Sequence, residues 1–196
     1  MVAVKLLKLL INRAASDQVL VKYLRVFIGI LANTLLYFTE SLVDEKDQKA
    51  LDDIEEFGCH VINVMEGEEE PQFTYSIGIN QKQDKADLIV VGLKCELAHS
   101  IVNNYKDRML AGESFETGKF YSDFLGDFDV CFIEVDKSHY KEYLGWGLWL
   151  NDGDNFKVLQ LVWPTTDGIW PWDSGKSDYY KWAQPILNKS GELSKI

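Results

Sequence analysis

The sequence contains few residues of the kinds that build disulfide frameworks and metal centres. It has three cysteines and three histidines among 196 residues, and no two cysteines show the C-x-x-C spacing of a zinc site. An odd number of cysteines also argues against a disulfide framework, and unpaired thiols suit a reducing cytoplasm. We therefore expect a cytoplasmic protein in which Cys59, Cys95 and Cys131 behave as small, partly buried hydrophobic residues.

The sequence also lacks an uncharged stretch long enough to cross a bilayer. The longest charge-free run covers residues 26–39, which is shorter than the ~20 apolar residues that a transmembrane helix needs. We therefore expect no transmembrane segment.

Positive charge is scarce outside the N-terminal region. The net charge is -11, and residues 1–39 carry five basic residues against one acidic residue, a balance of +4 that leaves −15 for the remainder. Such an acidic surface repels phosphate backbones, so we do not expect nucleic-acid binding. It fits either plain solubility or a basic protein partner.

Residues 1–43 are the most aliphatic part of the chain and form a predicted helical extension. Three interpretations remain open. The extension forms two helices that pack outside the domain or against a second copy of the chain, it is a basic amphipathic segment that lies on a membrane surface, or it is a targeting segment. The first interpretation allows self-association through the N-terminal helices.

The local signatures of common enzymes are absent as well. The sequence contains no G-x-S-x-G elbow, no Walker loop, no G-x-G-x-x-G and no H-E-x-x-H. Cys59 and His60 are neighbours in a predicted strand, so their side chains point to opposite faces and form no dyad. Cys95 and His99 share one face of a predicted helix, but two ligands do not make a metal site. We predict no catalytic residue, no metal and no obligatory cofactor.

The hydrophobic pattern predicts one α+β domain over residues 44–187, followed by a polar tail over residues 188–196. The predicted sheet is mainly antiparallel, with closure toward a barrel as an open alternative, and one central amphipathic helix crosses it. The predicted helices cover residues 44–57 and 94–110, and the predicted strands cover residues 59–65, 73–79, 87–93, 118–121, 129–135 and 158–163. Residues 139–149 are ambiguous between helix and strand.

The most specific stretch is KVLQLVWPTTDGIWPWD at residues 157–173. A run of β-formers ends at a proline, and an Asp-Gly turn follows. Two interpretations remain open: a hydrophobic corner that closes the core, or a slot for a flat ligand or for a partner's side chain. The candidate binding residues here are Trp163, Asp167, Gly168, Trp170, Trp172 and Asp173.

Three further side chains are candidates of a weaker kind. Tyr75 contributes only if the fold brings it to the tryptophans. His60, on a strand beside the core, is more often a structural histidine than a functional one. His99 either is partly exposed without a role or serves as a ligand or hydrogen-bonding group.

Several segments of the chain resemble a known bacterial family, the one called domain of unknown function 4262. They are FGCHVINV, FTYSIGI, DLIVVGL running into KCELAHSIVNN, AGESFETGKFY and VLQLVWPTTDGIWPWD, in that order, within residues 44–187. The resemblance implies one bacterial domain and brings no activity with it. The sequence departs from the family at Cys59, where an aromatic residue is usual, and residues 1–43 lie outside the resemblance.

A weaker likeness concerns flavin reductases with a split β-barrel, which open with a similar succession of two strands and a helix. That likeness implies a bound flavin. However, the chain has only Lys82, Lys85 and Lys94 where such enzymes hold the flavin phosphate.

Two functions are therefore predicted. The first is a non-enzymatic binding module of the immunity or accessory kind, which binds a protein through the aromatic-acidic surface around residues 163–173. The alternative is a redox enzyme or ligand-binding protein in which the tryptophans stack on a small planar ligand such as a flavin.

Overall fold

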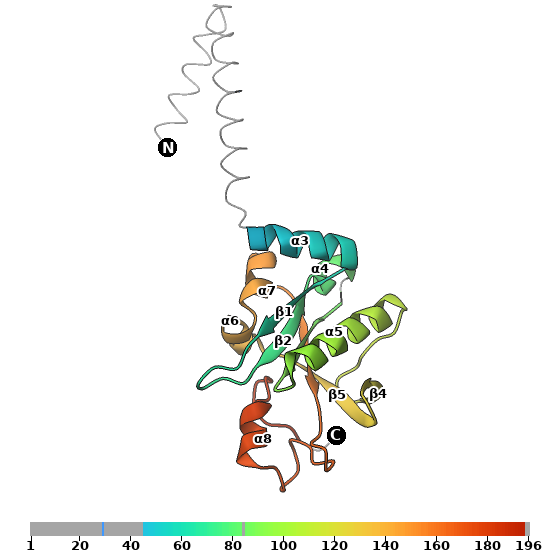
Figure 1. Cartoon of the computed structure of the whole chain (residues 1–196), viewed down its shortest axis with the longest axis vertical. Helices are drawn as coiled ribbons and strands as arrows, with labels where there is room; N and C mark the ends of the chain where they lie inside the picture. The colour runs from blue at the N-terminus through green and yellow to red at the C-terminus, as the bar shows by residue number, and fades with distance from the viewer. Residues whose placement is uncertain (1–28, 30–44, 84, 195–196) are drawn as a thin grey trace, which may run out of the picture. The chain divides into compact units, whose positions relative to one another are not determined.

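The computed structural model describes residue 29, residues 45–83 and residues 85–194. A division into two units falls between Lys49 and Ala50, and the second unit, Ala50–Ile196, contains the whole sheet. The predictions for residues 1–43 concern a region that, apart from Gly29, lies outside the described residues. Figure 1 shows the arrangement of the described elements.

Six strands form one open sheet in the order β1-β2-β3-β6-β5-β4. The strands are β1 (His60–Val64), β2 (Phe73–Ile77), β3 (Asp87–Val91), β4 (Phe120–Leu125), β5 (Phe128–Glu134) and β6 (Val158–Val162). Every neighbouring pair is antiparallel except β3 and β6, which run parallel. The mainly antiparallel α+β sheet is thus confirmed. Closure toward a barrel is wrong, because β1 and β4 stand at opposite ends of the strand order and do not pair.

The central strands β2 and β3 are buried along their whole length. For β3, the continuous apolar run DLIVVGL predicts this, since a strand covered on both faces has no need to alternate polar and apolar residues. Helices accordingly lie on both faces of the sheet.

One face is covered by α5 (Cys95–Leu110), which crosses the sheet in Figure 1. Its buried residues recur at helical spacing and pack against strand residues that point to the same face. These helix residues are Ala98, Ile101, Val102, Tyr105 and Met109, and the strand residues include Leu88, Val90, Val130, Phe132 and Leu161.

In the described part of the chain, the helices on the other face are α3 (Glu45–Phe57), α6 (Tyr140–Tyr143) and α7 (Gly145–Leu150). The short 3₁₀ helix η1 (Lys137–His139) leads into α6. The core on this side includes Ile54, Tyr75, Ile77, Ile89, Tyr143 and Leu144. The aromatic stretch at residues 139–149, ambiguous in sequence, is therefore helical.

A short helix, α4 (Ile79–Gln83), follows β2 directly and shortens the predicted strand 73–79. The buried carboxylate of Asp87 holds its beginning by accepting hydrogen bonds from Ile79 N–H (3.1 Å) and Asn80 N–H (3.4 Å). Gly78, at φ 101°, allows the turn, and a Cβ atom there would lie 2.7 Å from Ile54. The side chain of Ile54 therefore packs closely against the backbone at Gly78.

The C-terminal segment folds back over the ends of β3 and β6. It contains α8 (Asp178–Ala183), which the sequence did not predict, and two buried glutamines that bond it to β6. Gln160 donates to Pro185 O and accepts from Leu187 N–H, and Gln184 Oε1 accepts from Trp163 N–H. This segment is therefore part of the packed domain as far as Leu187, which is buried.

Candidate functional site

Trp170 and Trp172 stack face to face on the side of the sheet away from α5. Their ring centroids are 4.7 Å apart and their planes differ by 8°. Phe120, from the edge strand β4, meets both indoles edge-on at 5.1 Å and 6.2 Å. We call these three residues the aromatic patch. Beneath it lie Cys131, Ile133, Val162 and Ile186.

The turn that carries the two tryptophans is closed by Asp173. Its carboxylate accepts a 2.8 Å hydrogen bond from Trp170 N–H, and its own N–H donates to Trp170 O at 3.0 Å. Lys176 Nζ donates to Pro171 O at 2.6 Å and fixes the same turn from the other side. The backbone that carries the two indoles is therefore fixed by hydrogen bonds within the turn.

The patch is accessible from solvent. Phe120 is 44% exposed, and Trp170 and Trp172 are both half-buried. Large aromatic side chains at the surface, held rigidly beside an apolar cluster, have the properties of an interface anchor because they offer contact area at a small entropic cost.

An acidic side chain lies along the same face of the sheet. Phe120 pairs with Cys131 in the β4–β5 ladder, and Asp129 is two residues from Cys131, so the alternation of the strand places both on one face. Asp129 is exposed. The face of the sheet that carries the patch therefore also carries a solvent-accessible carboxylate.

Trp163 is separate from the patch. Its indole N–H donates to Val91 O at 2.9 Å, and its ring meets Tyr180 edge-on at 5.3 Å. Its backbone carbonyl accepts from Tyr180 Oη and from Gln184 Nε2. Every polar group of Trp163 is thus engaged in joining β6 to β3 and to the C-terminal segment.

Asp167 and Gly168 form an exposed turn between Trp163 and the patch. Gly168 has φ 77°, and its N–H donates to Thr165 O at 2.9 Å. Ile169 N–H adds a bond to the Thr165 hydroxyl. The turn orients the chain and leaves the Asp167 side chain in solvent.

The remaining candidates lie elsewhere in the fold. Tyr75 is buried in the core on the side of α6 and α7, and its hydroxyl accepts from Trp146 N–H. Burial raises the pKa of Tyr75 to about 12, against the opposing effect of that hydrogen bond. His60 contacts Asp53 through Nδ1 at 2.7 Å. The structure therefore does not bring Tyr75 or His60 to the tryptophans.

His99 lies on α5, on the opposite side of the sheet from the aromatic patch. It lines a shallow hollow of about 550 Å³ together with Asn63, Cys95, Glu96, Ser100 and Asn103. Cys95 and His99 thus share a face, as their spacing predicts.

Phe120 is the residue of the patch that sequence reasoning missed. Nothing local marks it, because its role depends on contact with residues some fifty positions further along the chain. A strand was expected at residues 118–121, but the face that Phe120 takes follows only from its pairing with Cys131.

A second hollow, of about 540 Å³, adjoins the patch. Lys176, Lys181, Tyr180 and Pro185 are among its lining residues, and Ile186 and Leu193 connect it to the cluster under Trp170 and Trp172. Over the residues that the structure describes, no group of three or more His, Cys, Asp and Glu side chains is placed to hold a metal ion. Within the same residues, none of the helices has the length and apolar character needed to cross a membrane.

Comparison with known proteins identifies a family for this chain but assigns no activity to it. No curated protein and no solved structure matched the chain. A family model, Domain of unknown function (DUF4262), matches residues 53–177, a span that contains the sheet and the aromatic patch. Since the match covers more than half of the 196 residues, the chain belongs to the DUF4262 family.

Proposed function

We propose that this protein is a non-enzymatic binding module of the immunity or accessory kind, and that it binds a basic protein through the aromatic patch. The observation that carries the proposal is the stacked pair Trp170–Trp172, fixed by Asp173 and flanked by the exposed ring of Phe120. A preformed aromatic surface of this kind reduces the ordering cost of association.

The partner's charge follows from the charge of this chain. The net charge is -11, and Asp129 lies on the same face as Phe120. An arginine of the partner would stack its guanidinium on the outer face of an indole and reach a carboxylate with its N–H groups. Long-range attraction between opposite net charges would also accelerate the encounter.

The packing of the patch argues against a slot for a flat ligand. Two rings 4.7 Å apart and nearly parallel leave no room between them for a third ring. A planar ligand could therefore stack only on an outer face of the pair. Trp163, the third tryptophan of the motif, is engaged in the core and takes no part in such a slot.

A flavin-type or other planar ligand remains the second candidate, and the adjoining hollow favours it. Two lysines, Lys176 and Lys181, line this hollow next to the patch, and cationic side chains suit a phosphate. Both lysines already have partners, Pro171 O and Asp178 respectively. Titration with flavin mononucleotide tests this candidate directly, because binding beside Trp170 and Trp172 would quench tryptophan fluorescence.

The binding module is tested by affinity capture with matched baits. The full chain, a Phe120→Ala/Trp170→Ala double variant and a Trp149→Ala control would be immobilised and offered the same extract. Trp149 suits the control because it is an exposed tryptophan (42%) on α7, away from the patch. We expect the same basic protein on the wild type and the control, absent from the double variant and released by salt.

Two results would count against the module. One is a set of captured proteins that is identical for all three baits. The other is a double variant that loses its circular dichroism spectrum, because the aromatic residues would then serve the fold rather than a partner.

A further inference from the structure

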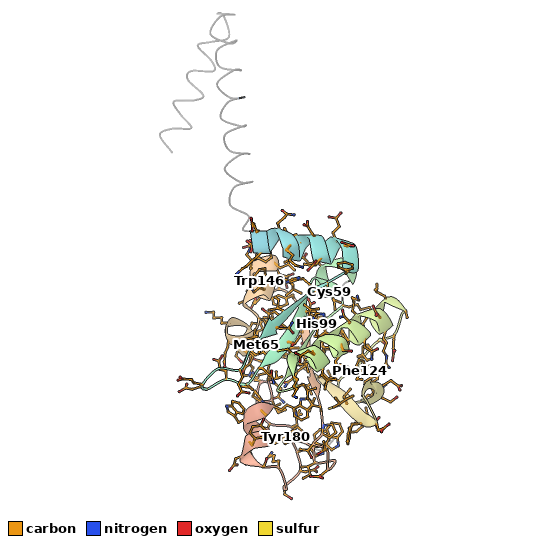
Figure 2. The ribbon with its side chains drawn as sticks, viewed as in Figure 1. Cys59, Met65, His99, Phe124, Trp146 and Tyr180 are labelled. Atoms are coloured by element: carbon orange, nitrogen blue, oxygen red, sulfur yellow. The ribbon has the colours of Figure 1, made fainter. Side chains whose placement is uncertain are left out.

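Two sulfur atoms meet on the α5 side of the sheet, away from the aromatic patch. Cys95 Sγ lies 3.8 Å from Met65 Sδ, and Met65 is 72% exposed although its side chain is apolar. Met65 follows β1, and Cys95 is the first residue of α5, so two separate elements bring the sulfurs together. Figure 2 labels Met65 and also His99, which lies on the same helix as Cys95. Nothing in the local sequence requires this contact.

A third ligand-type side chain lies on the same helix as Cys95. His99 is one helical turn after Cys95 and lines a hollow together with it. Among the residues that the structure describes, no hydrogen bond or ion pair holds the His99 imidazole. The ring is therefore free to turn toward the two sulfurs.

The sulfur–sulfur distance suits a shared metal ion. With metal–sulfur bonds of about 2.3 Å, two sulfurs 3.8 Å apart subtend an angle of about 110° at the metal. An imidazole nitrogen would complete a three-coordinate site of two sulfurs and one nitrogen. Cys95 and His99 both line the hollow, which is open to solvent, so an ion can reach these two side chains.

The chemical type of the ligand atoms indicates which metal ion the site would prefer. A thioether is a soft ligand that favours Cu(I) and its heavier analogue Ag(I), whereas zinc sites use thiolate, imidazole and carboxylate. No cluster of three such zinc ligands exists in the described part of the chain. We propose that Met65, Cys95 and His99 form a binding site for a soft monovalent metal ion, with Cu(I) as the natural ligand class.

The other two cysteines do not compete for the ion. Cys59 and Cys131 are buried, at 4% and 0% exposed. Burial raises the pKa of Cys59 to about 11 and that of Cys131 to about 12, which opposes the thiolate form that a metal needs. Binding at Cys95 exchanges the thiol proton for the metal ion, so one proton is released for each ion bound.

The site is tested by anaerobic titration of the full chain with Cu(I) against a coloured chelator. We expect one ion per chain and release of one proton. Cys95→Ser should abolish binding, and Met65→Leu and His99→Gln should each weaken it by at least about tenfold, as loss of even an orienting partner does. His139→Gln, which alters a half-exposed histidine away from α5, is the matched control.

Each alternative result overturns the proposal. Binding that survives Cys95→Ser would place the ion elsewhere. Binding that depends on Cys95 but is unaffected by Met65→Leu and by His99→Gln would be an ordinary thiol adduct. Failure of the wild type to take Cu(I) from the chelator would remove the site altogether. Because all three side chains are at least partly exposed, circular dichroism is expected to be the same for every variant.

Discussion

The carbonyl oxygen of Ala183 occupies the space that a Cβ atom on Gly92 would need. Gly92 follows β3 and has φ 82°, and Ala183 ends α8. Two segments some ninety residues apart therefore touch backbone to backbone. The absence of a side chain at Gly92 allows the C-terminal segment to close over the ends of β3 and β6.

Gly92→Ala should destabilise the domain more than a Gly→Ala substitution at a glycine with no atoms close to the added Cβ. The new Cβ would meet backbone, which cannot rotate away, and the left-handed φ adds about 1 kcal/mol. We expect a loss of more than about 3 kcal/mol in the free energy of unfolding, measured by urea denaturation. Gly168→Ala is the control, since Gly168 has φ 77° with open space around it and should lose only about 1 kcal/mol. Equal losses at both positions would contradict the close approach of the two backbones.

The Trp170–Trp172 stack should appear as an interaction energy between the two side chains. A double-mutant cycle with Trp170→Leu and Trp172→Leu is expected to give a coupling of about 0.5 to 1.5 kcal/mol, beyond the area that each indole buries. The measurement is chemical denaturation of the four proteins. Strict additivity would mean that the two rings do not stack in solution.

The contribution of Asp87 to stability should decrease as the pH rises. A salt-bridged carboxylate, whose pKa is lowered, would show the opposite dependence. Burial raises the pKa of Asp87 to about 7, and hydrogen bonds from Ser76 Oγ–H and from backbone N–H groups oppose that rise. The folded state thus holds its proton more tightly than the unfolded chain. The contribution to stability is complete below about pH 4 and is lost as the pH rises toward about 7.

Asp87→Asn removes this titration. The difference in unfolding free energy between wild type and variant should therefore change across the interval from about pH 4 to about pH 7 and stay constant above it. Asp167→Asn, at an exposed turn, is the control and should show no such change. A wild-type advantage that grows with rising pH would show that hydrogen bonding outweighs burial at Asp87.

The three thiols should differ sharply in reactivity. Cys95 is half-buried, whereas Cys59 and Cys131 are buried and their pKa values are raised by that burial. A colorimetric thiol reagent should therefore modify one cysteine quickly in the native protein and the other two only on unfolding. Cys95→Ser should eliminate the fast phase. Two fast thiols in the wild type would contradict the burial of Cys59 or Cys131.

Arg108 should be poorly replaced by lysine. Its guanidinium donates two 2.6 Å bonds to the Glu113 carboxylate and stands 4.4 Å from the ring centroid of Phe124. It also donates to Ser122 O on the edge strand β4. We expect Arg108→Lys to lower the free energy of unfolding by about 1 kcal/mol, measured by thermal or urea denaturation. The lysine ammonium can neither form the pair of parallel hydrogen bonds to the carboxylate nor stack as a planar group on the Phe124 ring. Lys119→Arg, at an exposed pair with Glu116, should be neutral.

The sequence predicts the elements whose signal is local. The apolar run at β3 and the helical spacing on α5 both reflect what each residue buries, and burial leaves a periodic pattern. The five-residue helix α4 leaves no such pattern, because it is too short to show a period. It forms where the distant carboxylate of Asp87 accepts from its first N–H groups.

The candidate site was predicted only in part for a related reason. The tight turn around Asp173 is encoded by neighbouring residues, so Trp170 and Trp172 could be identified together. Trp163 looked equivalent to them in sequence, yet its indole bonds to Val91. Phe120 could not be placed at all, since only the pairing of β4 with β5 decides which face its ring takes. Closure of the sheet was likewise undecided, because a strand pattern does not specify which edges meet.

The single parallel pair in the sheet has a consequence for how the domain forms. Strands β1, β2 and β3 pair in chain order, as do β4, β5 and β6, so each antiparallel half assembles from nearby segments. Within the sheet, the two halves are joined by the β3–β6 pairing, which runs from Asp87–Val158 to Val90–Leu161. Closing that long loop reduces chain entropy before any favourable interaction between the halves offsets it. The β3–β6 junction is therefore expected to form late, as the rate-limiting event in folding, and to be the first place where the sheet separates when the domain opens.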